Sequence, residues 1–124
     1  MFTVFVVFAA LAAVVHAFAF VLEAVLFPQP RTHRRFGVRT PEEVQTLRTV
    51  MVNQGFYNLF LAIGLITSIP LAASGRCALA YFCCLFAAAC GAVLVLSKRE
   101  MWRPALMQSA PPLVAALTLF IANR

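Results

Sequence analysis

Four long stretches of apolar residues, separated by short polar segments, dominate the chain. They cover residues 2–27, 50–73, 77–97 and 105–122. A run of about 20 apolar residues crosses the roughly 30 Å hydrocarbon core of a bilayer as an α-helix. Inside lipid a helix pairs every backbone N–H and C=O within itself. The pattern therefore predicts an all-α, polytopic membrane protein, a bundle of four transmembrane helices in a single domain over residues 1–124.

Short signals predict where the helices begin and end. Pro28 and Pro30 stop the first helix because proline lacks an N–H and blocks further turns. The segment Thr40–Glu43 supplies a hydroxyl N-cap, a proline at the first helical position and two acids in the first turn. The second helix should therefore begin near Pro41, outside the bilayer. The expected helices are 2–27, 41–73, 77–97 and 104–122.

Composition and charge support a membrane protein and argue against a nucleic-acid binder. Apolar residues make up 63% of the 124 residues and charged residues only 11%. A water-soluble fold of this size has too little interior to hide so much apolar surface. The net charge of +6 could indicate a nucleic-acid binder. The basic residues, however, lie between the apolar runs rather than along one face, and no nucleic-acid motif is present, so nucleic acid is not an expected partner.

The positions of the basic residues predict the orientation. The first and third connectors, with the adjoining helix ends, carry Arg31, Arg34, Arg35, Arg39, Arg48, Lys98, Arg99 and Arg103. The opposite side carries only Arg76 and Arg124. Because basic residues accumulate in cytoplasmic loops, both termini should lie on the non-cytoplasmic side. We expect a multi-pass protein of the cell (inner or plasma) membrane.

Polar residues within the apolar runs indicate where function lies. Glu23 follows His16 by seven residues, so the two side chains share one face of the first helix. An ionisable residue inside a span is costly and is therefore a functional candidate. At about 1.5 Å per residue, polar groups on the first, second and fourth helices lie at one level, in the cytoplasmic half of the bilayer. The candidate ligand-binding or proton-handling residues are His16, Glu23, Asn53, Gln54, Tyr57, Asn58 and Gln108.

These polar groups should turn inward and meet, because each would cost several kcal/mol against lipid. We expect a pocket lined by His16, Glu23, Asn53, Asn58 and Gln108. The alternative is a structural hydrogen-bond network that holds three helices together. Amides alone would serve that purpose, and yet the chain also carries a carboxylate and an imidazole, which favours a site. His16 and Glu23 alone are too few ligands for a metal ion, so no metal, cofactor or catalytic residue is expected.

Small residues at helical spacing predict close contacts between helices. Ala9, Ala13 and Ala17 form one such stripe, and Ala87 with Gly91 forms another. The cysteines fall in or beside the third run without a CxxC motif or a histidine at metal-ligand spacing. We interpret them as small apolar packing residues and assign no function to Cys77, Cys83, Cys84 or Cys90.

Several motifs together resemble a family of small four-helix bacterial membrane proteins of unknown function. They are Leu22-Glu23-x-x-Leu26-Phe27-x-x-Pro30 with His16 upstream, Phe36-Gly37, Asn53-Gln54-Gly55-x-Tyr57-Asn58-x-Phe60-Leu61-Ala62, and Gln108-x-x-Pro111. The resemblance covers nearly the whole chain. It implies that His16, Glu23, Asn53, Gln54, Gly55, Tyr57, Asn58 and Gln108 belong to a shared pattern. It implies no activity.

Our leading hypothesis is a polar intramembrane pocket, open to the cytoplasmic leaflet, that binds a small amphipathic or lipid-like molecule. The expected partners are that molecule and membrane lipids, with homo-oligomerisation left open.

Three alternatives remain. A proton-coupled exporter is suggested because the size, the four helices and the membrane glutamate look like the small multidrug-resistance transporters, although the strong charge bias departs from them. A membrane enzyme would use His16 and Glu23 as acid and base, but no nucleophile elbow, metal cluster or phosphate loop supports it. The chain could also be a structural accessory subunit.

Overall fold

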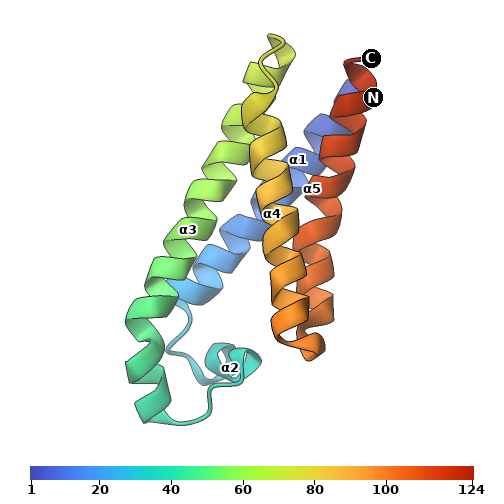
Figure 1. The fold of residues 1–124 in the computed structure, drawn as a ribbon. Helices are drawn as coiled ribbons and strands as arrows, with labels where there is room; N and C mark the ends of the chain where they lie inside the picture. The colour runs from blue at the N-terminus through green and yellow to red at the C-terminus, as the bar shows by residue number, and fades with distance from the viewer. The chain divides into compact units, whose positions relative to one another are not determined.

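The computed structural model describes residues 1–124, which form helices and no strands (Figure 1). Four helical segments are long and apolar enough to cross a membrane, which confirms the predicted all-α, four-helix membrane class. The elements in chain order are α1 (Phe2–Phe20), the π-helix η1 (Val21–Val25), α2 (Pro30–His33), the 3₁₀-helix η2 (Arg34–Phe36), α3 (Pro41–Ala73), α4 (Ala78–Ser97), the 3₁₀-helix η3 (Arg99–Met101) and α5 (Trp102–Ala122).

The first helix differs from its predicted form. The α-helix stops at Phe20 and continues as a π-helix to Val25, short of the expected end at Phe27. The N–H of Leu26 bonds to the carbonyl of Val21, five residues back, at 2.9 Å. Hydrophobic periodicity does not reveal such a turn, because every residue around it is apolar except Glu23.

The start of α3 agrees with its prediction, since the backbone begins at Pro41. The N–H of Glu43 donates to Thr40 Oγ1 at 3.2 Å, and Glu43 Oε2 accepts the N–H of Thr40 at 3.1 Å. This reciprocal pair is a capping box, which satisfies N–H groups that have no partner within the helix. At 33 residues α3 is about 50 Å long, more than the roughly 30 Å of a hydrocarbon core.

The other end of α3 closes with a left-handed glycine. Gly75 has φ of 82°, a conformation that residues with a side chain rarely adopt. The N–H of Arg76 bonds to Leu71 O at 2.9 Å, and the N–H of Gly75 bonds to Ala72 O at 3.0 Å. These two bonds form a Schellman motif, which stops α3 and lets α4 begin at Ala78.

The chain divides into two compact units, which are described separately. The first contains residues 1–15 and 61–124, and the second contains residues 16–60. Within the first unit, both termini and the α3–α4 turn lie at one end, and the connection through η3 lies at the other (Figure 1). Arg76 and Arg124 therefore share an end that excludes Lys98 and Arg99, in the arrangement that the charge analysis expected.

In the first unit α4 packs closely against α5. A Cβ added at Gly91 would lie 2.9 Å from Ala105 O and would overlap the Ser109 hydroxyl, so only glycine fits there. Ser109 Oγ donates to the carbonyl of Ala88 at 3.1 Å. Ala87 is fully buried beside them, in agreement with the predicted small-residue contact. Of the four free thiols, those of Cys83 and Cys84 are buried, as expected for packing residues.

Candidate functional site

The second unit brings the end of the first span against α3 at very short range. A Cβ added at Gly55 would lie 2.8 Å from Ala24 Cβ, 2.9 Å from Ala24 N and 3.2 Å from Phe20 O. Real Cβ atoms do not approach backbone atoms so closely, so the crossing requires glycine at position 55. The ring of Phe20 packs edge-on against Phe56, with centroids 5.2 Å apart. Gly55 thus sets the distance between the two helices that carry the candidate residues.

Across this crossing a single asparagine bridges the histidine and the glutamate. Asn58 Oδ1 lies 2.7 Å from His16 Nδ1. Asn58 Nδ2 donates to Glu23 Oε2 at 2.7 Å and to the carbonyl of Gln54 at 3.3 Å. The side chains of His16, Asn58 and Glu23 therefore form one hydrogen-bonded chain, which we call the His–Asn–Glu cluster. The structure thus joins these three residues across two helices, and their role in binding a ligand or handling protons stays a prediction.

The cluster determines which nitrogen of His16 carries its hydrogen. An amide oxygen only accepts hydrogen bonds, so His16 Nδ1 must donate to Asn58 Oδ1. In a neutral imidazole, Nε2 then carries a lone pair. His16 is 1% exposed, and its Nε2 has no hydrogen-bond partner in the structure. Buried polar atoms are nearly always paired, so this nitrogen is the most unusual atom of the site.

Glu23 lies within the π-helical turn η1. A π-helix inserts extra backbone into a turn and rotates the following residues relative to the regular helix, and such turns recur at functional sites. The side chain of Glu23 is half-buried, with one oxygen bonded to Asn58. The half-buried carboxylate can accept a hydrogen bond from a bound group, and His16 Nε2 is a second acceptor that the protein leaves buried and unpaired.

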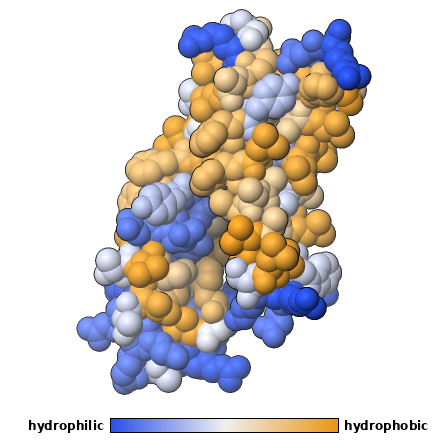
Figure 2. Space-filling view, viewed as in Figure 1, coloured by the Kyte–Doolittle hydropathy of each residue, from blue (hydrophilic) through white to orange (hydrophobic).

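Three of the predicted residues are not turned inward. Asn53, Gln54 and Tyr57 all lie on the exposed surface of α3, with Tyr57 62% exposed. Asn53 is five residues from Asn58, which places it about 140° away around the helix and off the face that carries the cluster. Gln54 shares the face of Asn58 but contributes its backbone carbonyl. Figure 2 shows a hydrophilic patch over this part of α3, surrounded by hydrophobic surface.

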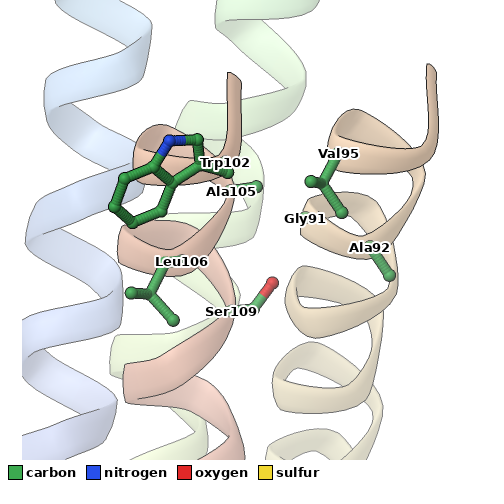
Figure 3. Close-up of a pocket in the computed structure, with 7 residues that line it drawn as sticks. All are labelled: Gly91, Ala92, Val95, Trp102, Ala105, Leu106 and Ser109. Atoms are coloured by element: carbon green, nitrogen blue, oxygen red, sulfur yellow. The ribbon is translucent and has the colours of Figure 1, made fainter. Parts of the chain in front are cut away.

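Gln108 belongs to the first unit, where its side chain on α5 is half-buried. Its part in the site stays a prediction. The same unit contains an open surface pocket of about 340 Å³ between α4 and α5 (Figure 3). Ser109 points toward α4 there, and the other lining residues are apolar or glycine. This pocket contains no predicted site residue, and it lies along the α4–α5 contact described above. The lining residues are Gly91, Ala92, Val95, Trp102, Ala105, Leu106 and Ser109.

The polar connector between the first two spans contains two short helices, α2 and η2, which the sequence did not predict. The side chains of Thr32 and His33 are 5% and 8% exposed. His33 Nδ1 donates to the carbonyl of Val38 at 2.7 Å. A usable signal was present: Pro30 at the first position of α2 and Gly37 after η2, with φ of 79°, are typical of the two ends of a short helical segment.

Comparison with known proteins identifies the family of this chain but indicates no activity. No curated protein and no solved structure matches the chain. A family model described as a protein of unknown function, DUF1304, matches residues 2–120. Since that match spans nearly the whole chain, this four-helix membrane protein belongs to the DUF1304 family.

Proposed function

We propose that the protein is a multi-pass protein of the cell (inner or plasma) membrane that binds the polar end of a small amphipathic or lipid-like molecule. The binding site is the His–Asn–Glu cluster. The single observation that carries the proposal is the buried, unpartnered Nε2 of His16.

A bound group would satisfy that nitrogen. Asn58 occupies Nδ1 of His16 and one oxygen of Glu23, which leaves Nε2 and the rest of the carboxylate as acceptors. A buried acceptor without a partner costs about 1–3 kcal/mol. A ligand hydroxyl or ammonium would donate to it and recover that free energy. The structural alternative, a network that only joins helices, gives no role to an unpaired nitrogen.

The surface beside the cluster supports an amphipathic ligand. Asn53, Gln54 and Tyr57 interrupt an otherwise apolar helix surface, and Glu23 is only half-buried. Phe56 and Phe60 on the same helix are exposed, with ring centroids 6.1 Å apart. A polar head at Glu23 with an apolar tail along these rings matches both kinds of surface. By the charge bias of the connectors, this site lies toward the cytoplasmic leaflet.

The test is recovery of the ligand from native membranes. The protein is extracted with its surrounding lipid by a styrene–maleic acid polymer, and bound small molecules are identified by mass spectrometry. We expect one amphipathic species to be enriched with the wild type and to be lost in Glu23→Gln and His16→Phe. The matched control is Gln45→Ala, which alters an exposed polar residue of α3 outside the apolar stretch. Retention of every bound species in the folded cluster variants would refute the proposal.

Three further measurements separate the alternatives. Proton flux into liposomes that depends on an added drug and on Glu23 would indicate an exporter instead. Chemical conversion of the recovered molecule during incubation would indicate an enzyme, and a stoichiometric protein partner would indicate an accessory subunit.

A further inference from the structure

We propose that the connector between α1 and α3 is a second binding site, for the phosphate group of an anionic phospholipid, held between the guanidinium groups of Arg34 and Arg39. This site lies outside the His–Asn–Glu cluster and does not depend on its proposed function.

The first observation is uncompensated charge. Residues 28–41 contain four arginines and no acidic residue. The acidic residue whose side chain contacts this segment is Glu43. Its Oε2 accepts the backbone N–H groups of Arg39, at 2.9 Å, and Thr40, at 3.1 Å, so it serves as a helix cap. No guanidinium group of this segment forms an ion pair, although the backbone bonds from Arg39 and Thr40, with the charge of Arg39, hold the pKa of Glu43 below its usual value. The segment therefore keeps an excess of positive charge that an external anion can meet.

The second observation is that the connector is ordered by its own contacts. Two bonds join His33 and Val38 in both directions: the N–H of Val38 donates to His33 O at 3.1 Å, and His33 Nδ1 donates to Val38 O at 2.7 Å. Gly37 completes the turn with its N–H on Arg34 O at 3.0 Å. The ring of Phe36 packs against buried Phe27, with centroids 5.9 Å apart. The backbone positions of Arg34 and Arg39 are therefore fixed before any ligand arrives.

The third observation is that the two arginines line the same cleft. Arg34 and Arg39 line a cleft of about 400 Å³, and the end of the molecule that carries this connector is hydrophilic in Figure 2. A guanidinium group presents two parallel N–H donors, which match two oxygens of a phosphate. Arg34 and Arg39 are exposed, and the ordered backbone beneath them brings both side chains to the same cleft.

The position along the chain identifies the source of the phosphate. The connector follows directly after the first span, and α3 begins outside the apolar stretch. With the first span in the bilayer, the connector emerges on the side of the lipid head groups, and we place Arg34 and Arg39 among them. Clusters of basic residues immediately beside a span bind anionic lipids of the cytoplasmic leaflet.

The experiment compares two double variants with equal loss of charge. Wild-type protein, Arg34→Gln/Arg39→Gln and Arg31→Gln/Arg35→Gln are placed in nanodiscs of equal parts phosphatidylcholine and phosphatidylglycerol. Lipids retained on release are counted by native mass spectrometry, and thermal unfolding confirms the fold. We expect the Arg34/Arg39 variant to lose about tenfold or more of its phosphatidylglycerol retention, the effect of removing charge-assisted bonds to phosphate. The Arg31/Arg35 variant should retain it as the wild type does.

Inorganic phosphate forms the second arm. If phosphatidylglycerol is retained and added phosphate does not displace it, the site recognises the lipid head group as proposed. If phosphate alone binds and the lipid is not enriched, the phosphate chemistry holds but the lipid source is wrong. Equal loss in both double variants would mean attraction by net charge only, and no loss in either would mean no site; both results overturn the proposal.

Discussion

Two helix crossings in this protein each depend on a glycine at the contact, but the polar groups beside the two glycines differ. In the second unit Gly55 lets α3 approach the backbone of Ala24, and in the first unit Gly91 lets α4 approach the backbone of Ala105. Between helices in lipid, such close approach supplies van der Waals contact in place of a hydrophobic driving force. The geometry is alike in both crossings.

The polar groups at the two crossings differ. Beside Gly91 the hydroxyl of Ser109 bonds to a backbone carbonyl, and each group involved is neutral. Beside Gly55 the amide of Asn58 bonds to an imidazole and a carboxylate, and one imidazole nitrogen is left over. The Ser109 bond only joins two helices. The Asn58 bonds involve an ionisable carboxylate and an imidazole with an unpaired nitrogen, which a helix contact does not require. We therefore interpret the α4–α5 crossing as a packing contact, and the proposed function concerns the α1–α3 crossing.

The strongest test of this contrast removes the bridging amide. Asn58→Leu should lower the free energy of unfolding by about 3 kcal/mol, because it leaves both His16 and Glu23 without a partner. Unfolding by steric trapping in detergent micelles measures this value. Asn53→Leu is the matched control, since the same change at an exposed position should alter stability by less than about 0.5 kcal/mol. Equal losses of unfolding free energy in both variants would show that Asn58 stabilises the protein no more than the exposed Asn53 does.

Adding one methyl group at each glycine tests whether the crossings are equally tight. Gly55→Ala and Gly91→Ala should each destabilise the protein by about 2 kcal/mol through overpacking. Rescue by a second substitution should be partial at both crossings. Ser109→Gly removes the overlap with the Ser109 side chain in Gly91→Ala, but Ala105 O remains 2.9 Å from the added Cβ. Ala24→Gly removes the contact with Ala24 Cβ in Gly55→Ala, but Ala24 N at 2.9 Å and Phe20 O at 3.2 Å remain. Full rescue at both crossings would contradict the structure of the α1–α3 contact.

The smallest effect is expected from the serine. Ser109→Ala removes one neutral hydrogen bond between helices, which is worth about 0.6 kcal/mol in a membrane protein. The same unfolding measurement applies. Retention of the proposed amphipathic ligand should be unchanged in this variant, whereas the proposal expects it to be lost when the cluster is altered. A ligand loss on Ser109→Ala would move function to the α4–α5 pocket.

Much of this architecture could be predicted without coordinates. The spans follow from apolar runs, because the bilayer requires helices of a certain length. The start of α3 follows from Thr40 and Glu43, because a capping box is a local signal that a few neighbouring residues satisfy among themselves. His16 and Glu23 were identifiable as candidates because polar groups in lipid are costly wherever they lie.

Other features depended on contacts between distant residues. Four amides and a tyrosine of the spans were equal candidates by composition, and only the packing of α1 on α3 shows that Asn58 bridges while Asn53 faces outward. The π-turn at Glu23 likewise has no pattern in the local sequence. Hydrophobicity and capping act through neighbours along the chain and can be read from it. The partner of a side chain, and the lone pair that a partner leaves unused, depend on residues that only folding brings together.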